Sequence, residues 1–144
     1  MKVKNILYAL ATTIIFAACS KSGDSPTPTP NPPTPPTPTE ASIVFSIDID
    51  PGSGSIFSAT GASQAMKVTV SSTLPTAGVQ VDVKTTRDAD NTTISSSSLA
   101  STAAAISASI DSLKPGVLCT TTVVVTSKST SSNSATKTFK IVRK

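Results

Sequence analysis

Apolar and polar residues alternate one for one along several stretches of the last hundred residues of the chain. The apolar positions of these stretches are Phe45, Ile47 and Ile49; Met66, Val68 and Val70; Val79, Val81 and Val83; Cys119, Val123 and Val125; and Phe139 and Ile141. A period of two places such side chains on one face of a β-strand, and the β-branched residues that dominate here favour half-buried strands. The pattern therefore predicts short strands that share one core.

Turn-forming sequences separate these stretches. They occupy residues 51–54, 74–78, 88–91, 115–116 and 129–133, and are rich in Pro, Gly, Asn and Asp. Short strands spaced by such turns predict an all-β fold, a single antiparallel β-sandwich of about seven strands over residues 41–144. About one hundred residues suffice for one compact domain with a modest core, and not for two.

One stretch fits two patterns. Leu99, Ala103, Ile106 and Ile110 are spaced by four, three and four residues, as on one face of a helix. Ile106, Ala108 and Ile110 also alternate as in a strand. The residues that follow favour the strand.

The segment AAISASIDSLKPGVLCTTTVVVTS, residues 104–127, resembles a stretch of fibronectin type III and related immunoglobulin-like domains. In that family a Leu-x-Pro-Gly turn leads into an alternating strand. Leu113, Pro115 and Gly116 match the turn, and Cys119 stands where the family carries a tyrosine. The resemblance implies an immunoglobulin-like, fibronectin type III-like sandwich.

The N-terminus has the three parts of a secretory signal peptide. Lys2 and Lys4 provide a positive start, residues 6–18 are apolar apart from two threonines, and the run ends in two alanines. A membrane-spanning helix needs about 20 apolar residues. This run is shorter, and polar residues follow it from Ser20 onward, which favours the signal peptide.

The sequence FAAC at residues 16–19 resembles the lipobox of bacterial lipoproteins, which usually has leucine in place of this phenylalanine. The resemblance implies a signal peptide over residues 1–18, cleavage between Ala18 and Cys19, and lipidation of the Cys19 sulfur by a diacylglyceryl group. Its acyl chains, such as palmitate, anchor the chain to a membrane. Ser20, where Asp would imply retention at the inner membrane, implies the outer membrane of a Gram-negative cell, on its periplasmic face or at the cell surface.

Residues 19–40 connect this N-terminus to the predicted domain. Eight of the eleven prolines lie between Pro26 and Pro38, interspersed mainly with threonine. Proline fixes φ and lacks a backbone donor, so the tract forms neither a helix nor a β-ladder. We expect a disordered polyproline II spacer, in which the sixteen residues from Ser25 to Glu40, at about 3.1 Å each, reach about 50 Å.

The residue types that carry much enzyme chemistry are missing or scarce. The chain has no histidine and no tryptophan, and its one tyrosine, Tyr8, lies in the predicted signal peptide. The absence of histidine excludes a Ser-His-Asp triad, a Cys-His dyad and a histidine-ligated zinc site. Cys119 is interpreted as a small core residue with a free thiol. The sequence therefore predicts a protein that is not an enzyme and needs no cofactor.

Acidic pairs are the candidate cation ligands. Asp48 and Asp50 would share one face of a strand and could bind calcium together with carbonyls after Pro51. Asp88 and Asp90, with Asn91, form a second candidate in a predicted turn. For both groups we favour the alternative interpretation, that they are solvated turn residues.

Two short motifs suggest modification. The residues Asp111, Ser112 and Leu113 resemble the three-residue O-glycosylation sequon of some Gram-negative envelope proteins, which makes Ser112 a candidate glycosylation site. Residues 91–93 fit the N-glycosylation pattern.

Basic residues cluster at the C-terminus. From Ala41 onward nine Lys and Arg stand against six Asp, a net charge of +3. The cluster contains Lys137, Lys140, Arg143 and Lys144; alternation places Lys137 and Arg143 on one face and Lys140 on the other. The patch is small and lacks interleaved aromatic residues, so we expect no nucleic-acid partner. Lysines on an edge strand also oppose edge-to-edge aggregation.

These features together predict a membrane-anchored envelope lipoprotein that presents an immunoglobulin-like domain. The expected role is structural or one of protein interaction or adhesion, with an envelope protein of unknown identity as partner. The alternative is a small-ligand or glycan-binding module of an outer-membrane assembly.

Overall fold

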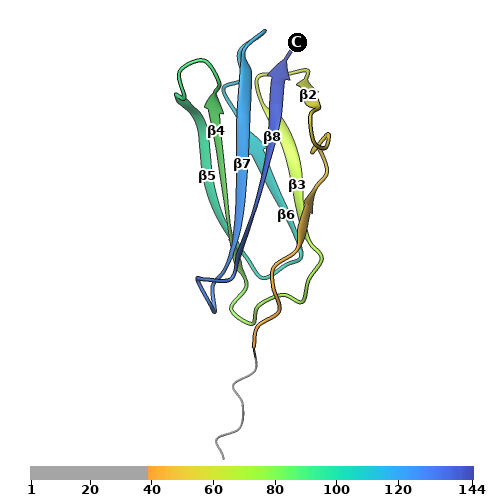
Figure 1. Cartoon of the computed structure of the whole chain (residues 1–144), viewed down its shortest axis with the longest axis vertical. Helices are drawn as coiled ribbons and strands as arrows, with labels where there is room; N and C mark the ends of the chain where they lie inside the picture. Colours follow the sequence, from red (N-terminus) through yellow and green to blue (C-terminus); the bar gives the residue numbers. More distant parts are fainter. Residues whose placement is uncertain (1–38) are drawn as a thin grey trace, which may run out of the picture. The chain divides into compact units, whose positions relative to one another are not determined.

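Residues 39–144 are described by a computed structural model and form a β-sandwich that contains no helix within this range (Figure 1). The strands are β1 (Phe45–Ile47), β2 (Ile56–Ala59), β3 (Gln64–Val70), β4 (Val79–Arg87), β5 (Thr93–Ser101), β6 (Ala105–Ile110), β7 (Leu118–Ser127) and β8 (Ser134–Arg143). The predicted all-β sandwich is confirmed, with eight strands where about seven were expected. The predicted signal peptide, the lipobox and all but the last two residues of the spacer lie outside the described residues.

The strands form two sheets. One has the order β1-β3-β6 and the other the order β2-β8-β7-β4-β5. Neighbours are antiparallel except β2 and β8, which are parallel, with Ile56 beside Lys140 and Ala59 beside Arg143. The prediction that every neighbouring pair is antiparallel is therefore wrong for this pair. The 48–55 connection carries the chain from one sheet to the other without a hairpin, which allows the parallel contact. Gly52 and Gly54, at φ 84° and 78°, provide the left-handed backbone of that connection.

The apolar faces predicted from the alternation meet in one core. Of the apolar positions that define the five alternating stretches, only Ile49 is more than 6% exposed, and it packs against the core from its rim. Burial of one such valine, isoleucine or phenylalanine side chain contributes about 1.5–3 kcal/mol. The core therefore stabilises the sandwich through the side chains that the period of two selects.

The ambiguous stretch is two strands and not a helix. Leu99 belongs to β5, whereas Ile106 and Ile110 belong to β6, with a turn between them. Ile106 and Ile110 are buried on the inner face of the three-stranded sheet. The strand prediction for residues 106–110 is confirmed.

Strand β5 is the longest element that the alternation does not predict. It pairs with β4 alone, in a register that sets Ser97 opposite Val83 and Leu99 opposite Val81. Its inward-facing residues are only half-buried, because five strands face three and β5 lies at the margin of the sandwich (Figure 1). Serine suffices at such positions, so the hydrophobic signal is lost.

A pair of buried hydroxyl groups joins β4 to β7. Thr85 and Thr121 lie directly opposite each other, are fully buried, and place their Oγ1 atoms 2.9 Å apart. Each hydroxyl satisfies the other, so these inward positions carry polar atoms without an unpaired group.

Candidate functional site

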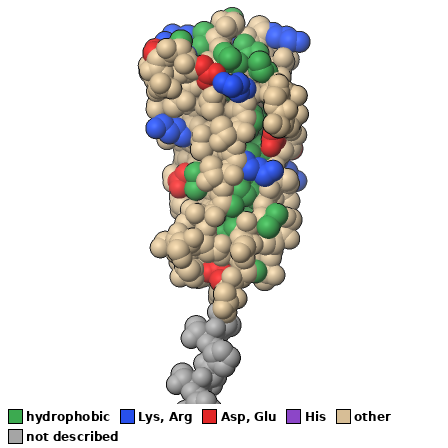
Figure 2. Space-filling view, in the orientation of Figure 1, with side chains coloured by type: hydrophobic (Ala, Val, Ile, Leu, Met, Phe, Trp, Pro, Cys, Tyr) green, Lys and Arg blue, Asp and Glu red, His purple; other side chains and the backbone are tan. Residues whose placement is uncertain are grey.

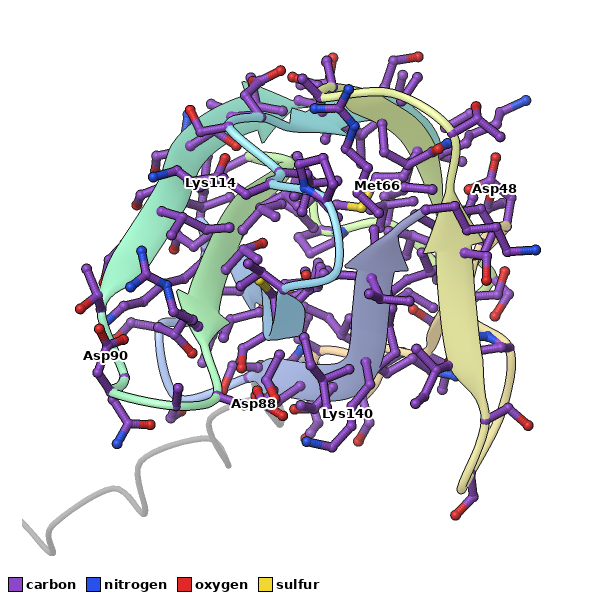
Figure 3. All side chains as sticks on the ribbon, turned by 90° about the horizontal axis from the view of Figure 1, so that it is seen from above. Asp48, Met66, Asp88, Asp90, Lys114 and Lys140 are labelled. Carbon is purple, nitrogen blue, oxygen red and sulfur yellow. The ribbon has the colours of Figure 1, made fainter. Side chains whose placement is uncertain are left out.

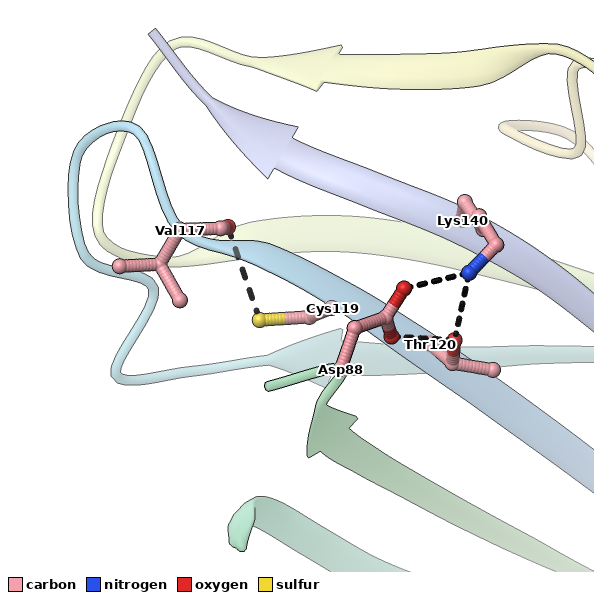
Figure 4. A network of polar contacts seen from close by, with 5 residues as sticks. All are labelled: Asp88, Val117, Cys119, Thr120 and Lys140. Atoms are coloured by element: carbon pink, nitrogen blue, oxygen red, sulfur yellow. Dashed lines mark hydrogen bonds and ion pairs between the residues drawn. The ribbon is translucent and has the colours of Figure 1, made fainter. Parts of the chain in front are cut away.

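The thiol of Cys119 is an inert part of the core. Cys119 lies near the start of β7, is fully buried, and its Sγ is 3.7 Å from the carbonyl oxygen of Val117 (Figure 4). Burial, and secondly the nearby negative charge of Asp88, raise the pKa of the thiol. Its burial as a free thiol confirms the interpretation of Cys119 as a small core residue, and the raised pKa favours the protonated, less nucleophilic form.

Asp88 is the centre of a polar network at one end of the five-stranded sheet. It directly follows β4, and its carboxylate accepts a hydrogen bond from Thr120 Oγ1 of β7 at 2.6 Å and pairs with the ammonium of Lys140 on β8 (Figure 4). The Lys140 ammonium, and then the Thr120 hydroxyl, hold the pKa of Asp88 below its usual value. The network ties three strands together.

Asp90 and Asn91 complete the turn after β4. The Asp90 carboxylate accepts a hydrogen bond from the Thr92 amide at 3.0 Å and pairs with Arg87 at 3.0 Å. The Thr92 amide is the main cause of the lowered pKa of Asp90. Asn91 has a φ of 57°, the left-handed conformation that asparagine tolerates in turns. Asp88 and Asp90 thus bind different partners within the chain.

Asp48 and Asp50 lie beyond the end of β1, so the expectation that they share one face of a strand is wrong. Asp48 Oδ1 accepts a hydrogen bond from the Lys67 amide at 2.8 Å, and Asp50 Oδ1 accepts one from the Gly52 amide at 3.0 Å. The Asp50 bond closes the turn after the strand, and the Asp48 bond ties that turn to the neighbouring strand β3. Asp48 lies on the opposite side of the sandwich from Asp90, while Met66 points into the core between them (Figure 3).

Within residues 39–144, no three or more acidic or cysteine side chains gather in an arrangement that could hold a metal ion. The carboxylates of both candidate groups bind backbone amides, hydroxyls or cations of the chain itself.

The basic residues near the C-terminus point in different directions. Lys140 pairs with Asp88, Lys137 lies 3.9 Å from Asp50, and Arg143 donates a hydrogen bond to the carbonyl of Leu113 at 3.2 Å. The view in Figure 2 shows charges of both signs dispersed over a mostly neutral surface. The cluster in the sequence is therefore not a basic patch on the fold.

Ser112 is presented outward immediately after β6. It is exposed and has a φ of 63°. Asp111 before it accepts hydrogen bonds from the hydroxyls of Ser63 and Ser109, and Leu113 after it is buried. The candidate glycosylation site thus projects from a turn whose two flanking residues are held by the fold.

Asn133 holds the point where the chain enters the sandwich. Its Nδ2 donates a hydrogen bond to the Ala41 carbonyl at 2.9 Å, and its Oδ1 accepts one from the Ile43 amide at 3.1 Å. The side chain thereby bonds to the backbone as a neighbouring strand does. This clamp fixes the direction of the segment that leads back to the predicted spacer.

Glu40 lies beside the same clamp. The side chains of Ser127, and then of Thr130 and Asn133, lower the pKa of Glu40 against an opposing effect of burial, although neither Glu40 carboxylate oxygen makes a hydrogen bond of ordinary geometry. Open hollows flank this segment on both sides, one of about 540 Å³ lined by Glu40, Thr130, Asn133 and neighbouring serines. Hydroxyl and amide groups dominate the surface at this end of the domain.

No protein family, no curated protein and no solved structure matches this chain. Among residues 39–144, none forms a helix with the length and apolar character needed to cross a bilayer. The described phenylalanines are used for packing: Phe45 and Phe139 are buried and Phe57 packs against the core. The site must therefore be judged on geometry alone.

Two features were missed by the sequence patterns. The clamp joins Asn133 to residues some ninety positions earlier, and nothing in a turn sequence indicates such a contact. The open edge of β5 is hidden because its inward positions are serine-rich. The serine run at residues 95–98 between two apolar residues is the signal that marks it in retrospect.

The Asp88 network predicts a pH-dependent contribution to stability. A folded-state pKa below the usual 3.8 means that ionised Asp88 favours folding above that pH, and that this contribution disappears as the pH falls through the lowered value. We expect Asp88→Asn to lower the free energy of unfolding at pH 7 by less than about 1 kcal/mol, because the ion pair is partly solvated. In acid the wild-type chain and the variant should become equally stable.

Denaturant titrations between pH 7 and pH 2.5 measure this difference. Lys140→Met serves as the matched control, since it removes the main cause of the lowered pKa and should abolish most of the pH-dependent difference. A gap between wild type and Asp88→Asn that widens on acidification would contradict the assignment.

Proposed function

We propose that this protein is a lipid-anchored envelope protein that presents an immunoglobulin-like domain on a proline stalk, with a structural or protein-interaction role. The observation that carries the proposal is the order of parts along the chain. An apolar leader ends at FAAC, Cys19 begins a polar segment, and a tract rich in proline and threonine leads to one compact sandwich. A lipid, a spacer and a single domain together hold a surface at a distance from a membrane.

The strand order supports an immunoglobulin-like topology. In such domains the first, second, fourth and fifth strands of the basic seven share one sheet, and the third, sixth and seventh share the other. The three-stranded sheet of this domain has counterparts of the first, second and fifth strands and none of the fourth. Here β1, β3 and β6 form one sheet, and β8, β7 and β4 lie side by side in the other. β5 lies beside β4, the counterpart of the third strand, where some of these domains carry an additional strand. β2 then corresponds to a continuation of the first strand, β1, that has crossed into the five-stranded sheet.

A role without catalysis fits the polar groups of the domain. The carboxylates near the turns bind groups of the chain itself, and Cys119 is shielded and protonated. What the described residues leave available are strand edges and hydroxyl-rich loops. Such edges accept extended segments of partners by β-augmentation.

The proposed location of the protein is the outer membrane of a Gram-negative cell. Ser20 after the lipidated cysteine supports it, and two or more acyl chains anchor a protein stably, at about 0.8 kcal/mol for each buried methylene. The spacer would then extend the domain up to about 50 Å from the headgroups. Within the described residues, the Asn133 side chain holds Ala41 and Ile43 where the chain enters the sandwich.

Cross-linking in intact membranes tests the interaction role. A photoreactive residue in place of Ser98, on the exposed face of β5, should give a discrete adduct of defined mass, whereas the same residue in place of buried Val123 should give none. Recovery of the monomer alone from the Ser98 position and from Ser112 would count against an interaction role.

A small-ligand or glycan-binding module is the second candidate function. The hydroxyl-rich hollows on both sides of Glu40 favour it, since hydroxyl and amide groups are hydrogen-bonding partners of sugars. Specific binding on a glycan array that is lost in Asn133→Ala would support it. An array without signal removes it.

A further inference from the structure

We propose that the open edge of β5 pairs with β5 of a second copy of this chain, antiparallel about a two-fold axis at Ser97. The inference names one partner for the interaction role proposed above. It depends on the proposed lipid anchor only where the effective concentration at a membrane is invoked. The strand edge that carries the inference belongs to β5, residues 93–101.

β5 is the longest strand of the described residues that has one side without a neighbour. The other outer strands have three, four and six residues, while β5 has nine. Edges of this kind are normally protected by charged residues or proline. The sequence TISSSSLAS contains neither, and in Figure 1 no element lies beyond β5 at that margin. The edge is long, neutral and bordered by small side chains.

The contrast with β8 is informative. β8 is covered by β2 only from Lys140 to Arg143, so its first half is also open on that side. That half carries Lys137, which extends to Asp50. The chain thus protects one open stretch with a charge and leaves β5 without protection.

An unsatisfied hydroxyl group marks the centre of the β5 edge. Ser97 faces inward beside Val83, and its Oγ is shielded from solvent without a hydrogen-bond partner. A buried hydroxyl without a partner is unfavourable. Antiparallel pairing about Ser97 sets the two Ser97 residues directly opposite, with Cα atoms about 4.5–5.5 Å apart, so rotation of both side chains about χ1 toward the open edge allows a hydroxyl–hydroxyl bond.

The same kind of hydroxyl pair already occurs inside the domain, between β4 and β7. Thr85 and Thr121 lie opposite each other on β4 and β7, and their hydroxyls bond across the strands. A second copy would repeat the arrangement at Ser97 and remove the unsatisfied group.

The neighbouring charges select the same register. On the outer face of the sheet Asp82 lies beside Ser98, and Lys84 lies beside Ser96. With the axis at Ser97, Ser98 of one copy is opposite Ser96 of the other, so each row across the joined sheets has Asp82 at one end and Lys84 at the other.

Axes at the adjacent residues are disfavoured. An axis at Ser98 would align the two Asp82 residues in one row, and an axis at Ser96 would align the two Lys84 residues. Like charges in one row are unfavourable, although three strand spacings of about 4.8 Å keep the effect small. The charges therefore favour this register only slightly, and the backbone ladder and the Ser97 pair provide the attraction.

Such a dimer is weak in free solution. One edge pair of nine residues buries less than the roughly 1,200 Å² of a standard interface. Anchoring to a membrane raises the effective concentration of the two copies without any new contact. Self-pairing is thus expected mainly for the anchored chain.

Cysteine cross-linking of the full chain in membranes tests the register. Ser97→Cys should form a disulfide-linked dimer under mild oxidation, because directly opposite residues have the Cα separation that disulfides require. Coexpressed Ser96→Cys and Ser98→Cys chains should cross-link to each other at least tenfold more than either does with itself. Ser53→Cys, on the exposed loop between β1 and β2, measures random collision.

The unsubstituted chain reports any bridge through Cys19 or Cys119. Circular dichroism of each variant shows whether the strands are retained, and the outward-facing Ser96 and Ser98 pair covers the case in which Ser97→Cys disturbs folding. Cross-linking no greater than that of Ser53→Cys in both arms overturns the proposal, as does an adduct with another protein in place of the dimer. Palmitate labelling is independent of this result, so failure of the dimer is distinguishable from failure of the anchor.

Discussion

Replacement of Cys19 by serine is expected to abolish the incorporation of radiolabelled palmitate into this protein. The proposed anchor is a thioether, and a serine hydroxyl cannot replace the sulfur in that bond. Loss of acyl chains that contribute about 0.8 kcal/mol for each buried methylene removes the whole anchoring energy. The expected effect is therefore complete loss of label.

The chain supplies its own control for this experiment. Cys119 is the other cysteine, and it is fully buried in the core. Cys119→Ala keeps a small apolar side chain at that position and should retain the label at the level of the wild-type chain. Label that persists in Cys19→Ser, or disappears in Cys119→Ala, would contradict lipidation at Cys19.

Replacement of Gly78 by alanine is expected to cause the largest loss of stability among single methyl additions at the glycines of the domain. Gly78 has a φ of 79°, and a Cβ there would lie 2.3 Å from the carbonyl oxygen of Ser101, at the end of β5. Backbone strain and this overlap together should lower the free energy of unfolding by about 3–5 kcal/mol. Domains of this kind are stable by only about 5–15 kcal/mol, so much of the total is at stake.

Gly116→Ala separates the two causes. Gly116 also has a positive φ, 70°, but nothing lies within 4 Å of an added Cβ. It should lose only the backbone term of about 1–3 kcal/mol. Denaturant titrations of both variants measure the difference. Equal losses would show that the close approach of β5 to Gly78 does not exist in solution.

The fold could be predicted where one face of a strand meets the core. The alternation at Val79, Val81 and Val83, or at Val123 and Val125, arises because one side of the sheet is buried and the other is in water. Where that condition fails, the pattern fails as well. β5 lies at the margin opposite a narrower sheet, so Ser95 and Ser97 serve at inward positions and no alternation is visible.

Pairing between distant segments could not be predicted from local patterns. The parallel contact of β2 with β8 depends on where the 48–55 connection leads the chain, and the residues of β2 contain no sign of their partner. The hydrogen bonds of Asn133 to Ala41 and Ile43 likewise join segments far apart in the sequence, and no local pattern indicates them.

The acidic candidates illustrate the limit for sites. The spacing of Asp48 and Asp50 fits a shared strand face, but β1 ends one residue before Asp48, where its carboxylate bonds to the Lys67 amide. The sequence shows which residue types are present, while hydrogen bonding to the backbone decides whether they are available. The favoured interpretation of these residues, and of Asp88 and Asp90, as turn residues agrees with the geometry.

Mass spectrometry of the N-terminus of the mature protein, isolated from its native membrane, tests the central claim most directly. The account predicts a chain that begins at Cys19 and carries the mass of a diacylglyceryl group on its sulfur. A chain that begins at Cys19 with a free thiol, or that still contains residues 1–18, would contradict it.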